Sequence, residues 1–592
     1  MEGFQAAGSG QRAAGSGQRA AGSGQRAAGS GQRAAGSGQR AVLVPVRSAG
    51  ALHRLLDVLP VFLGDPRISI RFTLAPGSDF GVEALAALDR SGARTVPWEE
   101  ALRTDHDLVL AASPKGELRE LAGPRVLLPH GAGFNKAVRD DGSPGVPSGM
   151  DPAYLLPGGT PWADLHALAH DDQVALLTQH CPSLAARAGV VGDPTLDRLL
   201  ASTGHRAHYR DALGTGPRQL VVLTSTWGPE SLLSRRPGLP GELVALLPQD
   251  AFQVALVLHP NEYSRTGAFD LSRRLAPALA AGLVLSRPYE EWAALLVAAD
   301  TVVTDHGSTA LYAAALGRPV VNAYDGGEEL LPGSPMARLL ALAPRLAEAR
   351  QLEEILPDAA GTDPRPVAEA AFARQGEALP RLQRSLYRML GLDPVAAAPE
   401  ARAFPAPDGV NHRPAAHAVR TELDGLRISV ERFPPQTPRT VHHLAAEHPK
   451  AGPRAVQSAA VLWRCARTAT AAGPAEPRRA STTWTAAGWT ADVLEEAPLC
   501  RTVAAVLSAE RCLLRHRAHG LFSIRVEPHR AGGRVSRIDP VAAVSAVHAW
   551  LSAATPAAVA SAVPVVLTCG AGPLTVRVQV CPPAPEDLDH EL

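Results

Sequence analysis

The chain has 592 residues, enough for about three or four domains. Its formal net charge is zero and no basic block lies beyond the N-terminus, which argues against nucleic acid as a partner. No apolar run reaches the ~18–20 residues that a membrane helix needs, and the N-terminus lacks an apolar signal core. We therefore expect a cytoplasmic protein, at most peripheral at the inner face of the cell membrane.

The N-terminus is a perfect repeat. Five copies of Ala-Ala-Gly-Ser-Gly-Gln-Arg fill residues 6–40. Because the unit has no large apolar side chain, burial cannot offset the entropy of ordering it, and we expect a disordered tail over residues 1–40. Weak attraction of its arginines to an anionic membrane surface is the alternative to a tail without function.

Residues 41–395 alternate between strand and helix patterns. The first run has strands near 41–46, 68–74, 108–112, 125–128, 174–178 and 189–191, with helices near 49–62 and 195–213. After a Gly/Pro linker at 214–217, a second run has strands near 220–224, 253–258, 283–285, 301–304 and 319–322. This alternation predicts an α/β protein with two Rossmann-like, doubly wound domains, at 41–213 and 218–395. A helical pattern over 367–392, with a kink at Pro380, could cross back onto the first domain.

Composition turns to Pro and Ala around 393–410, which marks a linker to a third region. Residues 411–592 predict an α+β domain, with strands near 426–433, 520–526 and 574–580 and a helix near 454–472. This region holds five of the six cysteines, and no Cys-x-x-Cys pair occurs in the chain. We expect buried, reduced thiols and neither a metal nor a cofactor.

The segment 299–321 reads as strand, polar turn, helix and strand. Asp305, His306, Gly307 and Ser308 form the turn, and Ser308 or Thr309 is a suitable N-cap for the helix that follows. A helix that opens after a strand presents unpaired N–H groups, which suit a phosphate. An ordinary turn that binds nothing is the alternative.

Two histidines follow predicted strands. His130-Gly131 follows the strand near 125–128, and His259-Pro260 follows the strand near 253–258. Ligands of open parallel sheets bind at these carboxyl ends, so two facing sheets would bring both histidines to one cleft. A histidine there can act as a general base, and the alternative is a helix-capping histidine without chemistry.

Short segments at these strand ends resemble the CDP-glycerol glycerophosphotransferases that build teichoic acids. In family order, the matching segments are His130-Gly131 with Lys136, Thr226-Trp227, His259-Pro260, Val303-Thr304-Asp305-His306-Gly307-Ser308 and Ala323-Tyr324-Asp325. They cover roughly residues 120–330. Three departures from the family pattern are Pro129 before the first histidine, Leu258 in place of an Arg-Pro pair, and His306-Gly307 in place of Tyr-Ser.

The resemblance implies a GT-B fold and transfer of a phosphoalditol group from a CDP-linked donor to a hydroxyl acceptor, either a polymer or a lipid-linked molecule. It implies His130 as general base and His259 as the group that stabilises charge on the pyrophosphate. The other implied residues are Thr226, Asp305, His306, Gly307, Ser308, Thr309 and Asp325 for the donor, Ser286 and Arg287 for its base, and Gly131 and Lys136 elsewhere in the cleft.

Two alternatives stay open. The Asp-His-Gly-Ser turn also resembles that of UDP-N-acetylglucosamine 2-epimerases, so a UDP-sugar glycosyltransferase or an epimerase-like enzyme is one of them. Because the cation before His259 is missing, a non-catalytic nucleotide-binding scaffold is the other.

Overall fold

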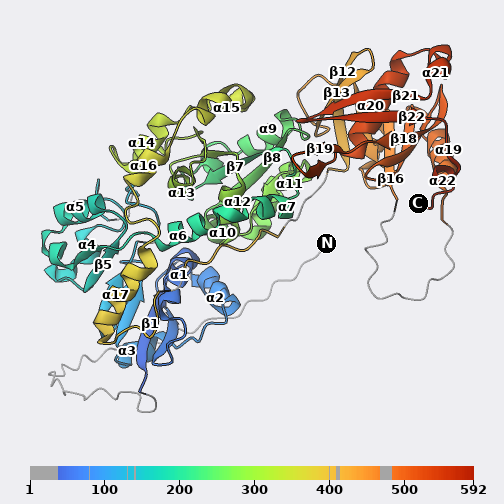
Figure 1. The fold of residues 1–592 in the computed structure, drawn as a ribbon. Helices are drawn as coiled ribbons and strands as arrows, with labels where there is room; N and C mark the ends of the chain where they lie inside the picture. Colours follow the sequence, from blue (N-terminus) through green and yellow to red (C-terminus); the bar gives the residue numbers. More distant parts are fainter. Residues whose placement is uncertain are drawn as a thin grey trace, which may run out of the picture.

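A computed structural model describes residues 38–78, 81–129, 131–138, 142–398, 400–408, 414–466 and 483–592. The chain forms three lobes, seen along the blue, green and orange-red parts of Figure 1. The predicted disordered tail lies outside the described residues except for its last three. Of these, Arg40 already belongs to the first strand.

The first unit is a six-stranded sheet in the order β2-β1-β3-β4-β5-β6, in which every pair is parallel. Its strands are β1 Arg40–Val46, β2 Ile68–Leu74, β3 Leu108–Ala111, β4 Arg125–Leu127, β5 Leu165–Leu168 and β6 Ala188–Val190. Its helices are α1 Ala49–Leu56, α2 Gly81–Arg90, α3 Trp98–Arg103, α4 Pro152–Leu155, α5 Asp171–His180, α6 Pro194–Ala201 and α7 Arg206–Ala212. Near-continuous Val and Leu runs such as β1 and β3 are buried, as parallel strands with both faces covered require.

The second unit is a five-stranded parallel sheet in the order β11-β10-β7-β8-β9. Its strands are β7 Gln219–Ser225, β8 Phe252–Leu258, β9 Val284–Leu285, β10 Thr301–Thr304 and β11 Val320–Asn322. Its helices are α8 Leu232–Arg235, α9 Leu239–Leu246, α10 Pro260–Thr266, α11 Ala268–Ala280, α12 Glu291–Ala298, α13 Thr309–Ala315, α14 Pro335–Leu342, α15 Leu352–Ala360 and α16 Arg365–Glu369. Short 3-10 turns are η1 Leu59–Phe62, η2 Glu117–Glu120, η3 Pro157–Gly159, η4 Pro182–Arg187, η5 Thr203–His205, η6 Gly327–Glu329 and η7 Ala349–Gln351.

Helix α17, Ala378–Leu390, follows the second unit but packs on the first, as the sequence predicted (Figure 1). Leu382, Leu386 and Tyr387 join the core of the first sheet. The kink expected at Pro380 is absent from α17, all of whose residues are described. Pro380 stands in the first turn, where the missing N–H removes no helical bond.

Residues 416–581 contain a closed nine-stranded barrel in the order β12-β13-β21-β22-β18-β17-β16-β15-β14. Its strands are β12 Ala416–Asp424, β13 Arg427–Phe433, β14 His443–Glu447, β15 Val461–Cys465, β16 Thr502–Ser508, β17 Arg511–His516, β18 Gly520–Val526, β21 Val565–Ala571 and β22 Leu574–Cys581. The hairpin β19 His529–Ala531 and β20 Arg534–Ser536 stands apart, and the helices are α18 Pro453–Ser458, α19 Ala486–Glu496, α20 Pro540–Ala553, α21 Pro556–Ala562 and α22 Pro585–Leu588.

Helix α20 is apolar on all sides and is enclosed by the barrel. Every residue from Val541 to Leu551 is buried, and α20 packs against β12, β13, β15, β16, β17 and β21. The sequence predicted an α+β domain here but not the closure of its strands around a helix.

Several predicted elements are wrong. The strand expected near 174–178 is part of helix α5, and the strand lies earlier, at β5. The helix expected over 454–472 is the short α18 followed by strand β15, and residues 467–472 lie outside the described part. Both segments are short apolar runs, which periodicity alone does not assign to helix or strand.

None of the six cysteines, all of which are described, forms a disulfide. Burial fits the expectation for Cys181, Cys500, Cys512 and Cys569, whereas Cys465 is exposed. Within the described ranges, every helix is too short or too polar to cross a bilayer.

Candidate functional site

The loop after β4 carries the first unit onto the second. The backbone N–H of Ala137 donates to the carbonyl of Glu329 at 2.9 Å, and Leu331 N–H donates to the Asn135 carbonyl at 2.9 Å. The Asn135 side chain also accepts from Met336 N–H, at the start of α14, at 3.2 Å. The carboxyl ends of the two sheets therefore meet through a short antiparallel contact between residues 135–137 and 329–331.

Asp305, directly after β10, is fully buried and holds the turn in place. Its carboxylate accepts backbone hydrogen bonds from Thr226 (2.9 Å), Leu232 (2.7 Å) and Gly307 (2.9 Å). Burial raises the pKa of Asp305, although His306 and the three N–H donors oppose that shift. A Cβ at residue 307 would lie 3.0 Å from Asp305 Oδ1, so glycine lets this turn pack against the loop after β7. Asp305 thus shapes the turn, and its oxygens are occupied.

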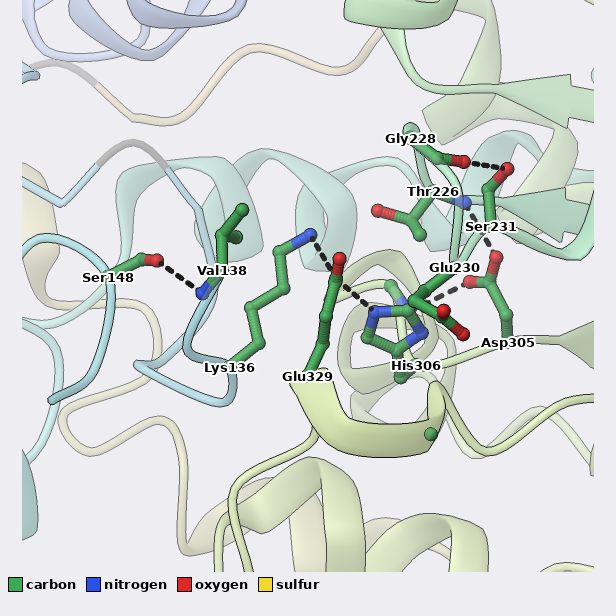
Figure 2. Close-up of polar contacts among 12 residues, drawn as sticks. Lys136, Val138, Ser148, Thr226, Gly228, Glu230, Ser231, Asp305, His306 and Glu329 are labelled. Atoms are coloured by element: carbon green, nitrogen blue, oxygen red, sulfur yellow. Dashed lines mark hydrogen bonds and ion pairs between the residues drawn. The ribbon is translucent and has the colours of Figure 1, made fainter. Parts of the chain in front are cut away.

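Glu329 is the centre of a polar chain that joins the two units, with His306 on one side of it and Lys136 on the other (Figure 2). His306 Nε2 lies 3.0 Å from Glu329 Oε2, and Lys136 Nζ lies 3.6 Å from the same oxygen. Burial alone would raise the pKa of Glu329, but the hydrogen bond to His306 and the charge of Lys136 outweigh it, and the pKa is lowered. His306 Nδ1 is buried without a hydrogen-bond partner against Gly326, where a Cβ would come within 2.4 Å of it.

The loop that follows His130 lies directly on the start of α13. A Cβ at Gly131 would lie 3.3 Å from Ser308 Oγ, so the two strand ends approach within side-chain contact. Ser308 occupies the N-cap position of α13, as predicted, but its hydroxyl makes no capping hydrogen bond. Ser308 and Thr309 are half-buried, whereas their neighbours Gly307 and Ala310 are buried.

His259 caps helix α10. Its Nδ1 accepts from Asn261 N–H at 3.1 Å, so in the neutral ring the proton resides on Nε2. The Trp227 ring lies between the two units, 6.3 Å from the His259 ring and 5.6 Å from Lys136 Nζ. The helix-capping geometry weighed as an alternative is present, and it leaves Nε2–H as a donor rather than a base.

His130 itself lies outside the described residues, but the chain directly before it is held firmly. Arg54 Nε donates to the Pro129 carbonyl at 3.1 Å, and the same guanidinium forms a bidentate ion pair with Asp193 at 2.7 and 2.9 Å. The Tyr312 hydroxyl, from α13 of the second unit, donates to Asp193 at 3.2 Å. Arg54 and Asp193 are buried, and burial raises the pKa of Tyr312.

Three residues predicted to bind the donor have other partners in the structure. Ser286 is buried, and its carbonyl accepts from the Tyr263 hydroxyl at 2.8 Å. The Arg287 guanidinium pairs with Asp408 and approaches Glu291 at 3.8 Å. Asp325 is half-exposed and lies 3.9 Å from Arg345.

The structure therefore brings together residues 131, 136, 226, 259 and 305–309, while Ser286, Arg287 and Asp325 contact other groups. Sequence reasoning missed Glu329, and it missed Arg54 and Tyr312, the two buried partners of Asp193. The glycine pair before Glu328-Glu329, just past a predicted strand, was the only local signal for Glu329. In the part of the chain that the structure describes, no cluster of His, Cys, Asp and Glu could hold a metal ion.

No protein-family model matches the chain, and no curated protein matches it in sequence. Solved structures with similar folds include the wall teichoic acid polymerase TagF, at 13% identity and a TM-score of 0.41, covering 60% of this chain and 90% of that one. They also include Staphylococcus aureus MnaA in complex with UDP (10%, TM-score 0.40, 62% and 100% covered). A third is the UDP-GlcNAc 2-epimerase of Neisseria meningitidis bound to UDP-GlcNAc (14%, 0.38, 60% and 99%). Likeness at this level assigns no activity to this chain.

Proposed function

We propose that this chain is a GT-B transferase that moves glycerol phosphate, or a related alditol phosphate or sugar, from a CDP-linked donor to a hydroxyl acceptor in cell-envelope polymer synthesis. The observation that carries the proposal is the contact between Gly131 and Ser308. It joins the segment that follows His130 to the turn whose sequence resembles the donor-phosphate segment of glycerophosphotransferases. The five sequence segments that resemble glycerophosphotransferases come at or shortly after the ends of β4, β7, β8, β10 and β11 in the chain, which supports the proposal.

In the proposed reaction, the acceptor oxygen attacks the β-phosphorus of the donor. The new O–P bond forms as the bond to the CMP oxygen breaks, and CMP leaves with the electron pair. His130 takes the acceptor proton. The Nε2–H of His259 and the hydroxyls of Ser308 and Thr309 donate to the phosphate oxygens, so that charge on the leaving group is stabilised by positioned donors.

Three other groups act by positioning in this proposal. Asp305 fixes the turn through three backbone hydrogen bonds, while Lys136 and Glu329 hold the loop after β4 against His306. The first unit supplies the acceptor side and the second holds the donor, with Asp325 reaching the ribose and residues 286–287 the base.

The direct test is release of CMP from CDP-glycerol in the presence of a glycerol phosphate acceptor. We expect release by the full chain, and about 10²–10⁴-fold slower release by His130→Ala with donor affinity nearly unchanged, because a general base contributes a factor of that size. The double variant Ser308→Ala, Thr309→Ala should instead weaken donor binding. Arg273→Gln, at an exposed ion pair on α11, is the matched control.

A thermal-shift screen of CDP- and UDP-linked donors separates the alternatives, since a ligand stabilises the native state by RT ln(1 + [L]/Kd). Stabilisation by a UDP-sugar with turnover of that sugar would replace the CDP-linked donor. Stabilisation by a nucleotide donor without release of CMP or UDP would favour a non-catalytic scaffold.

A further inference from the structure

A second cavity lies at the opposite edge of the second sheet, between its strand beginnings and the barrel. Its volume is about 580 Å³, and it is lined by Phe252 at the start of β8 and by residues 214–218 just before β7. The candidate transfer site occupies the carboxyl ends of the same strands. The two sites are therefore separated by the length of the sheet, and this one does not depend on the proposed function.

The contact between the barrel and the second unit frames this cavity rigidly. The Gln249 backbone N–H donates to the Arg432 carbonyl at 2.8 Å, and the Arg432 guanidinium pairs with Asp250 at 2.6 Å. Gly572 approaches so closely that a Cβ would lie 2.1 Å from the Asp250 carbonyl oxygen. Because these contacts are backbone and buried ion pairs, the cavity is a built feature of the interface.

The walls of the cavity come from both units and combine apolar side chains with polar ones. The second unit contributes Val244, Leu247 and Phe252, and the barrel contributes Trp463, Ile538 and Leu574. Trp463 lies in β15 and is 7% exposed, so its ring forms wall rather than surface. Cavities of about 300–1,000 Å³ with such walls suit small organic ligands.

The charged groups at the cavity are already paired. Arg432 contacts Asp250 and, at 3.1 Å, Asp539, while Arg537 pairs with Glu510 at 2.8 Å. Arg218 donates to the backbone carbonyls of Thr215 and Gly214. An anionic ligand would meet Asp250 and Asp539 without gaining an unengaged arginine, which argues for an uncharged ligand.

We propose that this cavity binds a neutral small molecule with both apolar and polar groups at the junction of the second unit and the barrel. Its occupant contacts both partners, so binding strengthens their contact. We infer the class of ligand from the apolar side chains in the walls and from the fact that Arg218, Arg432 and Arg537 already bind other groups of the protein.

The probe is prodan, a neutral naphthalene fluorophore, titrated into the full chain, with anilinonaphthalene sulfonate as the anionic comparator. We expect saturable one-to-one binding of prodan with a blue-shifted emission, and weaker binding of the sulfonate. Cys465 lines the cavity and is exposed, so saturating prodan should slow its reaction with Ellman's reagent. The Cys465→Ser variant identifies the signal of that thiol.

Ala281→Trp fills the cavity from the end of α11, where the residue is half-exposed and lines the wall. We expect it to abolish saturable prodan binding, while Ala268→Trp at the exposed opposite end of α11 leaves the binding constant unchanged. Far-UV circular dichroism checks that both variants fold. If one of them does not fold, the protection of Cys465 by prodan in the unmodified chain tests the proposal.

The proposal is overturned by absence of saturable prodan binding, by binding that does not protect Cys465, or by equal binding in Ala281→Trp and the unmodified chain. Tighter binding of the sulfonate than of prodan would overturn the uncharged class.

Discussion

Buried ionic side chains hold other parts of the molecule against both edges of the second parallel sheet. The two edges differ in what lies beside these side chains. At the carboxyl edge, Asp305 and the His306–Glu329 pair hold loops from the two units in place, and Ser308 and Thr309 beside them are half-buried. At the amino edge, Arg432 forms ion pairs with Asp250 and Asp539 that hold the barrel in place, and a cavity of about 580 Å³ lies beside them. One edge is therefore suited to a charged ligand held by a few donors, and the other to an uncharged one.

The largest expected effect comes from Arg54→Met, which removes the cation that ties Pro129 and Asp193 together. Because Asp193 would stay buried without its partner, we expect a loss of about 3–5 kcal/mol in local unfolding free energy around α6 and α13. Hydrogen exchange of amides in these helices measures it. The exposed pair of Arg273 and Asp270 gives the control, where Arg273→Met should cost at most about 1 kcal/mol. An equal loss of unfolding free energy in the two variants would contradict the claim that the Arg54–Asp193 ion pair stabilises α6 and α13.

Acid should lower the stability of the barrel more than that of the carboxyl edge. Burial lowers the pKa of His443 to about 4 and that of His548 to about 3, with their neighbouring histidines adding to it, whereas both would titrate near 6.5 in an unfolded chain. Between those values only the unfolded state binds the extra proton, so stability falls as pH falls, by about 1.4 kcal/mol per pH unit for each histidine. Because an unfolded histidine is already partly protonated at pH 6, the two together should cost about 2 kcal/mol between pH 6 and pH 5.

Hydrogen exchange in β16 and β17, corrected for the intrinsic pH dependence, reports this loss, with β10 as the reference at the other edge. The double variant His443→Gln, His548→Gln should reduce the pH dependence, and His417 and His516, whose pKa values burial also lowers, account for the rest. A dependence that is unchanged in that variant would assign the acid sensitivity to other groups.

The smallest effect is expected from Arg287→Gln. Its ion pairs with Asp408 and Glu291 are at the surface, and such pairs contribute about 0–1 kcal/mol, so stability should hardly change. If residue 287 reads the donor base as proposed, affinity for the donor falls in thermal-shift titrations although stability does not. Unchanged affinity would exclude residue 287 from the donor site and limit the proposed donor-binding residues at the carboxyl edge to 259 and 305–309.

Much of the fold could be predicted because its signals are local. Strands β2 and β10 lie where β-branched runs predicted them, with the same bounds. Helix α5 was mistaken for a strand because its Val-Ala-Leu-Leu core is short and its capping histidine, His170, is not a usual N-cap residue. Barrel closure could not be predicted, since pairing of β13 with β21 joins residues more than a hundred positions apart.

The candidate site divides in the same way. The turn at 305–309 follows from a strand, a polar run and a helix start that adjoin one another in sequence. The partners that give those residues their roles do not adjoin them: Glu329 reaches His306 from after β11, and Arg54 and Asp193 meet Tyr312 from another sheet. Such contacts depend on packing between units, for which a single sequence offers no periodic signal.

The enclosure of α20 has a consequence for how this chain is made. Strands β21 and β22 fit between β13 and β18, yet they are the last of the barrel strands to be synthesised. Until they arrive, the apolar surface of α20 has an open seam beside it, and the wall that Leu574 gives to the amino-edge cavity is missing. A nascent chain that stalls before residue 581 would thus expose the apolar surface of α20 to aggregation. The hairpin of β21 and β22 therefore completes both the barrel and the wall of the cavity beside it.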